Sequence, residues 1–249
     1  LDYSEIGRSN HYFCELAGLI WACWILEAGA ERDRCLEFAI AEIEKETAVQ
    51  FLSDGGNYEG STNYHRLSGE ALLFSVGVIR ALGRQVPDTI VSTLHKAADL
   101  TRAVQGNDGT IVQIGDTDSG RFFKLHPTAL RASFGGVTET FVENTLDHTG
   151  FVHGVDALFG NVSPGARLEA TVVKQLAPEP FRADDVRKGL ADYGDLDKLE
   201  AEAAQPQTTR RVRRLLLAGP VEPATWRRAA FPDFGLYIFR HDGFLVAFR

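Results

Sequence analysis

Apolar side chains recur every three or four positions along most of this chain, and this period predicts helices rather than strands. The first predicted helix covers residues 10–28, where Phe13, Leu16 and Ile20 share one face and other apolar positions nearly surround them. A helix that is apolar on almost every side is buried by several neighbours. The second predicted helix, over residues 32–51, has one apolar and one charged face, as expected of a helix that covers the first.

The same period predicts further helices over residues 66–82, 87–104, 127–133, 142–158, 183–191, 196–204 and 208–218. Two polar, glycine-rich stretches, residues 53–65 and 106–121, are predicted loops. The last part of the chain changes character. It predicts strands at 234–240 and 244–249, joined by a turn at His241-Asp242-Gly243.

These elements predict a mainly α protein: an incomplete α/α toroid of antiparallel helix pairs, followed by the first strands of an antiparallel β-sandwich domain. We place the domain boundary beside Pro220, because domains are joined by proline-containing polar segments. The predicted domains are residues 1–219 and 220–249. The chain begins at Leu1 and contains no methionine. We therefore expect an N-terminally truncated piece of a longer protein, or a sequence from which methionines were omitted.

Two segments far apart in the sequence are expected to meet at one rim of the helical part. A short connection around Ala30 joins the first two helices, so they should pack antiparallel. The second helix then ends beside the start of the first, and loop 53–65 begins at that rim. Neighbouring helix axes lie about 8–10 Å apart, so we expect Asn10, His11, Tyr64 and His65 to share one pocket.

This set of side chains offers an amide, an imidazole and a phenol. The sequence has no serine nucleophile elbow, phosphate loop or dinucleotide glycine pattern. A phenol has a pKa of about 10 and becomes a useful base only where its neighbours stabilise the phenolate. Asparagine and histidine can bind a carboxylate and so acidify the carbon next to it. Together the three groups suit a β-elimination at a uronic acid.

Four stretches of the sequence form a recognisable series: Ser9-Asn10-His11, Asp54-Gly-Gly-Asn-Tyr-Glu-Gly-Ser-Thr-Asn-Tyr-His-Arg66, Ile114-Gly-Asp-Thr-Asp-Ser-Gly-Arg121 and Phe231-Pro-Asp-Phe-Gly-Leu-Tyr. In this order, which spans nearly the whole chain, they resemble the heparinase II/III and alginate lyase group of polysaccharide lyases. The resemblance implies an α/α toroid followed by an antiparallel β-sandwich. It also implies elimination at a uronic acid residue, which leaves an unsaturated sugar.

The resemblance further implies that Asn10 and His11 neutralise the substrate carboxylate and that Tyr64 is the catalytic acid, and a candidate base as well. Four more candidates for substrate binding lie near them in the motifs: Glu59, His65, Arg66 and Arg121. A surface salt bridge is the alternative role for Arg66. A further family histidine, and any structural metal, belong to a β-domain segment that we expect beyond Arg249. We therefore predict no cofactor and no metal site in this chain.

Two other functions remain open at this stage. The carboxylates of Asp54, Glu59, Asp116 and Asp118 could form the catalytic pair of a glycoside hydrolase. We favour a turn-capping role for Asp54 and a contact of Glu59 with loop backbone or a basic neighbour. Asp116 and Asp118 have the spacing of a metal-binding pair, but the glycines around them favour a tight turn. A non-catalytic glycan-binding protein of surface polysaccharide assembly is the third possibility, because fold does not settle function.

Charge and composition narrow the class of partner. The 249 residues carry a formal net charge of −8, which disfavours nucleic acid because phosphate contacts need a basic surface. An acidic polysaccharide would need a local basic surface within this acidic whole. No run of 18 apolar residues occurs, so no membrane span is predicted. The resemblance favours a periplasmic or secreted protein, and the sequence leaves the oligomeric state open.

Overall fold

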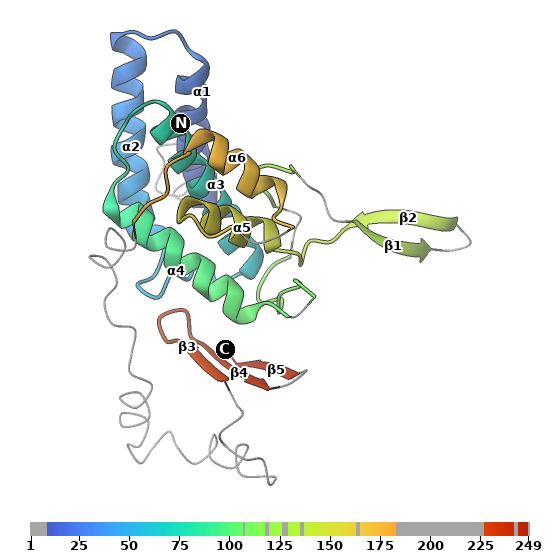
Figure 1. Cartoon of the computed structure of the whole chain (residues 1–249). Coiled ribbons are helices and arrows are strands. Elements are labelled where there is room, and N and C mark those ends of the chain that lie inside the picture. Colours follow the sequence, from blue (N-terminus) through green and yellow to red (C-terminus); the bar gives the residue numbers. More distant parts are fainter. Residues whose placement is uncertain are drawn as a thin grey trace, which may run out of the picture.

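The computed structural model describes residues 9–106, 108–117, 120–125, 129–134, 137–162, 165–182, 227–241 and 244–248. Helices dominate this part of the chain, and Figure 1 shows them gathered into one body, with a two-stranded hairpin at its side and a three-stranded sheet at one end. The prediction of a mainly α protein with C-terminal strands is confirmed for these residues. Closure of the helices into a toroid remains a proposal.

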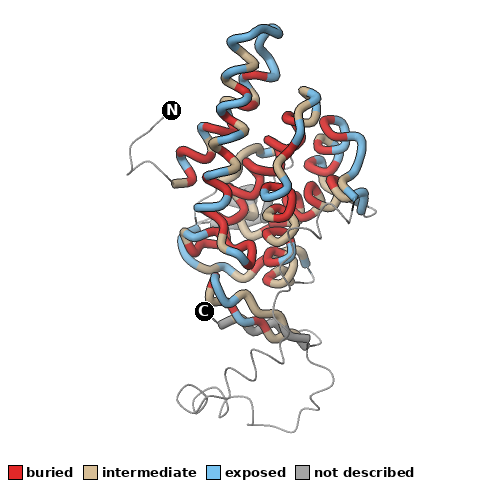
Figure 2. The backbone as a smooth tube through the Cα atoms, turned by 90° about the vertical axis from the view of Figure 1, so that its left-hand side faces the viewer, coloured by how far each residue is buried: buried red, intermediate tan, exposed pale blue. Residues whose placement is uncertain are grey.

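Helices α1 (Asn10–Ile25) and α2 (Ala30–Gln50) pack against each other as an antiparallel pair. The hydroxyl of Ser9 caps α1 by accepting the backbone N–H of His11 at 3.3 Å. The buried side chains of α1 include Phe13, Leu16 and Ile20, as predicted. Figure 2 shows burial concentrated where the pair meets the rest of the body, while its far end, at the connection between the helices, is exposed.

Helix α3 (Thr62–Ala81) is the central helix and is buried along most of its length. It packs against α1, α4, α5 and α6. It begins four residues before the predicted start at residue 66, because the Ser61 hydroxyl accepts the N–H groups of Asn63 and Tyr64, each at 3.2 Å. Tyr64 therefore lies in the first turn of a helix rather than in the loop before it.

Helix α4 (Asp88–Val104) matches its prediction within one residue at its start. The predicted helix over residues 127–133 is wrong, because this segment forms strand β1 (Ala129–Phe134), paired with β2 (Val137–Glu143). The sequence here alternates larger and smaller side chains around Gly135-Gly136, which is a hairpin signal.

The predicted helix 142–158 is correct only from Thr149, where α5 (Thr149–Leu158) begins. A further helix, α6 (Leu168–Leu176), was not predicted. The predicted helices over 183–191, 196–204 and 208–218, and the predicted domain boundary, lie outside the described residues.

The C-terminal strands β3 (Arg227–Phe231), β4 (Leu236–His241) and β5 (Phe244–Phe248) form an antiparallel sheet in that order. The predicted hairpin of β4 and β5 is confirmed, and β3 is an additional strand. The sheet joins the helical body through a second small core, whose buried members are Leu100, Val104, Ile111, Phe234, Leu236 and Ile238. No helix among the described residues is long and apolar enough to cross a membrane.

Candidate functional site

The start of α1 and the end of α2 lie side by side, as the helix pairing predicts. The Gln50 side chain donates to the Ser9 carbonyl oxygen at 3.0 Å and to Glu46 Oε2 at 3.1 Å. The Gln50 carbonyl oxygen accepts the N–H of Tyr58 at 2.9 Å. Residue 50 therefore connects α1 directly to the loop of residues 52–61, which we call the rim loop.

A polar contact at this rim joins Asn10 to Glu59, which are 49 positions apart. Asn10 Nδ2 donates to Glu59 Oε1 at 3.1 Å and to Oε2 at 2.9 Å. The backbone N–H of Asn10 also donates to Oε1, at 3.1 Å. The predicted meeting of the first helix with the rim loop is thus confirmed by three hydrogen bonds to one carboxylate.

His11 and Tyr64 lie in the first turns of α1 and α3, two helices that pack against each other. The side chain of His11 is exposed and Tyr64 is half-buried. The backbone N–H groups at both helix starts already have acceptors, since Asn10 N–H donates to Glu59 and Thr62 N–H donates to the Ile114 carbonyl oxygen. The first turns of the two helices thus lie at one rim, with the side chain of His11 open to solvent.

The loop of residues 111–117 crosses the N-terminus of α3. The Thr62 N–H donates to the Ile114 carbonyl oxygen at 3.0 Å, and the Ser61 hydroxyl donates to the Asp116 carbonyl oxygen at 2.7 Å. Asn63 Nδ2 donates to the Thr117 hydroxyl at 2.7 Å. The loop thus fixes the turn of α3 that contains Tyr64. Asp118 lies outside the described residues.

His65, a predicted substrate-binding residue, does not reach the surface, since it is 1% exposed. Its Nε2 lies 3.0 Å from the Ala97 carbonyl oxygen and 3.2 Å from the Thr101 hydroxyl. Burial lowers the pKa of His65 to about 4, partly opposed by the contact with the Ala97 carbonyl oxygen. His65 is therefore a neutral residue that joins α3 to α4 inside the body.

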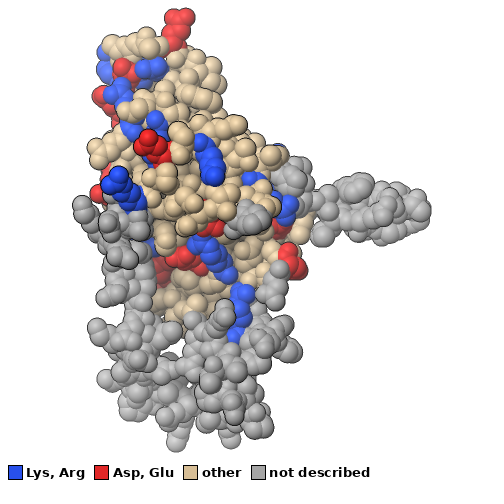
Figure 3. Space-filling model, viewed as in Figure 1, with Lys and Arg blue, Asp and Glu red and all other residues tan. Residues whose placement is uncertain are grey.

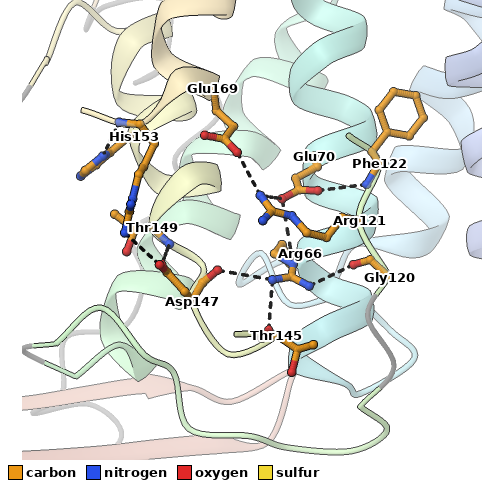
Figure 4. Close-up of polar contacts among 11 residues, drawn as sticks. Arg66, Glu70, Gly120, Arg121, Phe122, Thr145, Asp147, Thr149, His153 and Glu169 are labelled. Carbon is orange, nitrogen blue, oxygen red and sulfur yellow. Dashed lines mark hydrogen bonds and ion pairs between the residues drawn. The ribbon is translucent and has the colours of Figure 1, made fainter. Parts of the chain in front are cut away.

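Arg66 is also fully buried, instead of facing a ligand at the rim. As Figure 4 shows, its guanidinium group reaches Thr145 and Gly120, donating to their carbonyl oxygens at 3.0 and 3.1 Å. It also donates to the Asp147 carbonyl oxygen and to Asn63 Oδ1, each at 3.4 Å. Arg66 thus fastens two loops to the first turn of α3. Sequence could not show this, because the partners are mainly backbone oxygens.

The side chain of Arg121 is 3% exposed and lies between two buried carboxylates (Figure 4). Its Nη2 is 2.9 Å from Glu169 Oε1 and 3.3 Å from Glu70 Oε1. Glu70 Oε2 accepts the Phe122 N–H at 3.0 Å. With Arg66 these residues form a buried cluster of two positive and two potentially negative groups, which offers no surface for a sugar carboxylate.

Burial has a large effect on the pKa of Glu70 in this cluster and on the pKa of a neighbouring thiol. Burial raises the pKa of Glu70 to about 7, although Arg121 and Arg66 act in the opposite direction. Burial, followed by the charges of Glu59 and Glu70, also raises the pKa of the Cys14 thiol to about 11. The Cys14 thiol is thus influenced by the charges of both the rim carboxylate and the buried cluster.

The carboxylates of a possible hydrolase are largely used within the protein. Asp54 is buried, and its two oxygens accept the N–H of Gly56 at 3.1 Å and of Phe234 at 2.8 Å. It is thus the turn cap expected from the sequence, and it also ties the rim loop to the turn between β3 and β4. Glu59 is occupied by Asn10. Neither arrangement resembles a pair of carboxylates that flank a glycosidic bond.

Tyr58 is a rim residue that sequence reasoning did not single out. Its side chain is exposed, and burial of part of the residue together with Glu59 and Glu46 raises the pKa of its hydroxyl.

On the face drawn in Figure 3, acidic and basic side chains of the described residues are interspersed. Among the described residues, no group of three or more His, Cys, Asp or Glu side chains is arranged to hold a metal ion.

Comparison with known proteins adds one finding. A family model described as "Heparinase II/III N-terminus" matches residues 1–134, which is more than half of the 249-residue chain. This range includes the start of α1, the rim loop, the first turn of α3 and Arg121. Neither the curated proteins nor the solved structures contain a match to the chain.

Proposed function

Because this chain belongs to the heparinase II/III family, we propose that it is the helical part of a polysaccharide lyase that cleaves a uronic-acid-containing glycan by β-elimination. The observation that supports this most directly is the contact of Asn10 with Glu59. It places the first turn of α1 against the loop that leads, five residues later, into Tyr64. The substrate is an acidic polysaccharide such as a heparan-type glycan or alginate.

In this proposal Asn10 and His11 bind the uronate carboxyl group and remove the penalty for developing negative charge on the carbon beside it. The C5–H bond then breaks and its electron pair forms a C4=C5 double bond. The C4–O bond to the next sugar breaks, and the departing oxygen takes a proton. Tyr64 supplies that proton and, as phenolate, also accepts the C5 proton.

In this proposal three buried residues stabilise the elements that form the rim and do not contact the sugar: His65, Arg66 and Arg121. All three are nearly inaccessible to water. The contacts to the uronate come instead from His11 and from the Asn10 amide, both in the first turn of α1. We also propose that the helices belong to an α/α toroid over residues 1–219, that residues 220–249 begin a β-sandwich domain, and that the protein works in the periplasm or outside the cell.

The test uses the full-length protein with heparan-type glycans and alginate as substrates, and it follows the ultraviolet absorbance of the conjugated product. We expect wild-type protein to generate this absorbance. We expect Tyr64→Phe to lower kcat by about 100-fold or more, because it removes the acid and base of the reaction. The matched control is Tyr237→Phe, since Tyr237 is exposed on β4 and outside the rim.

Two results would contradict the proposal. New reducing ends without the ultraviolet absorbance would indicate a hydrolase, and glycan binding with neither product would indicate a non-catalytic protein. Unchanged turnover in Tyr64→Phe would remove Tyr64 from the mechanism. Circular dichroism of each variant establishes that it is folded.

A further inference from the structure

The carboxylate of Glu59 is fixed in space by its own loop. The Glu59 N–H donates to Asn57 Oδ1 at 3.1 Å, and the Gly60 N–H donates to the Asn57 carbonyl oxygen at 3.0 Å. Asn57 is 0% exposed, so this turn is part of the protein interior. Glu59 also places negative charge at the N-terminus of α1, where the helix dipole favours it. The residue therefore has a defined position before any ligand arrives.

The contact with Glu59 determines which way the amide of Asn10 faces. An ionised carboxylate only accepts hydrogen bonds, so the amide nitrogen must point toward Glu59 and the carbonyl oxygen away from it. The opposite orientation would set two acceptors against each other. The two carboxylate oxygens lie on the same side of Nδ2, so one N–H of the amide suffices for both contacts and the second N–H stays available.

We propose that Glu59 is a positioning residue, which holds the Asn10 amide in one orientation so that its second N–H donates to the uronate carboxyl group. This inference rests on the proposed function of Asn10. A positioned amide spends no energy on reorientation when charge develops in the transition state. Among the described residues, no other side chain holds the Asn10 amide.

A direct contact between Glu59 and the substrate is the less favourable alternative. Two carboxylates in close contact repel each other, and each disfavours ionisation of the other. Glu59 would therefore weaken binding if it touched the uronate directly. Acting through Asn10, Glu59 instead fixes the N–H that stabilises the uronate charge, so that the C5 proton becomes removable.

A double-mutant cycle in the full-length enzyme tests the inference. Glu59→Gln should lower kcat by about 10- to 100-fold, with KM changed by less than about threefold, because misplacing a catalytic group affects the transition state most. Asn10→Ala should lower kcat at least as much. The double variant should be no slower than Asn10→Ala, since Glu59 acts only through Asn10. Glu37→Gln, an identical change at an exposed position of α2, is the control.

If the loss of kcat in the double variant equals the product of the two single losses, the inference is wrong, because Glu59 then acts independently of Asn10. A second measurement does not need turnover: the side-chain amide resonances of Asn10 are compared by NMR in wild type, Glu59→Gln and Glu37→Gln. They should move in Glu59→Gln and stay in place in Glu37→Gln. If the wild type is active but the Asn10 amide resonances do not depend on Glu59, the inference is wrong and the proposed function stands. If the wild-type protein is inactive, the proposed function is wrong.

Discussion

The guanidinium group of Arg121 is enclosed by protein, with Glu70 and Glu169 as its charged partners. Removing water from such charges is costly, and the cost is offset only while every charge has its partner. Gly150 makes the arrangement possible, because a Cβ atom there would lie 2.6 Å from Glu169 Cδ. The sequence contains all these residues, but nothing in their spacing predicts that they meet, since the partners are about fifty positions apart.

Glu169→Gln should destabilise the protein by about 3–5 kcal/mol, because it leaves one buried positive charge without its partner. Urea denaturation of wild type and variant at neutral pH measures this free energy of unfolding. Glu179→Gln serves as the control, since Glu179 is exposed. A loss of less than about 1 kcal/mol would mean that water reaches Arg121 and that the cluster is not the interior group described above.

His65 makes stability depend on pH. Its pKa is about 4 in the folded protein and 6.5 in the unfolded chain. The unfolded chain therefore binds more protons between these values, so stability is complete above pH 6.5 and is lost as pH falls through 4. From pH 7.5 to 5 this amounts to about 2 kcal/mol.

The comparison that isolates His65 uses His65→Asn, unfolded by urea at both pH values. Other titrating groups, Glu70 and His148 among them, are common to both proteins and cancel in the difference. We expect the stability advantage of wild type over the variant to shrink by about 2 kcal/mol on acidification. An advantage that stays constant would show that His65 is already accessible to protons in the folded state.

At the scale of elements, the sequence predicted those segments whose own pattern determines their structure. Helices α1, α2 and α4 have long apolar periods, and their bounds were close to those observed. The start of α3 was missed because the Ser61 cap lies inside a stretch rich in glycine and asparagine. Helix α6 has nine residues, too few for a clear period, and it depends on packing against α5.

In the candidate site, too, some contacts could be predicted from the sequence and others could not. Helix pairing alone was enough to bring Asn10 to the rim loop. The position of an arginine relative to the surface was not predictable, because the buried carboxylates and backbone oxygens that hold Arg66 and Arg121 come from other elements. The contact of Glu59 with Asn10 was likewise not predicted, since a carboxylate in a loop has many possible partners.

At the scale of the whole molecule, the rim loop connects the helical body to the C-terminal sheet. Asp54 accepts the Phe234 N–H, Ser53 donates to Asp233, and the Phe234 ring packs directly on Gly56. A Cβ atom at position 56 would lie 2.5 Å from Phe234 Cδ2. The turn between β3 and β4 thus supports the loop that contains Glu59.

Gly56→Ala should therefore cost about 1–3 kcal/mol of stability, because the rim loop or the Phe234 ring must move. It should also lower turnover in an active full-length protein, since the displaced loop contains Glu59. Gly18→Ala is the control: a Cβ there meets nothing within 4 Å, and alanine favours the helix. Equal stabilities of the two variants would show that the sheet and the rim loop are not mechanically coupled.

The link between Asp54 and Phe234 spans 180 positions of the chain, and this has a consequence for synthesis. A nascent chain that has emerged only as far as α4 can pair α1 with α2, yet Asp54 still lacks its distant partner. The rim loop therefore receives its support from the sheet only after residue 234 has emerged, later in synthesis than any of the helices that the structure describes.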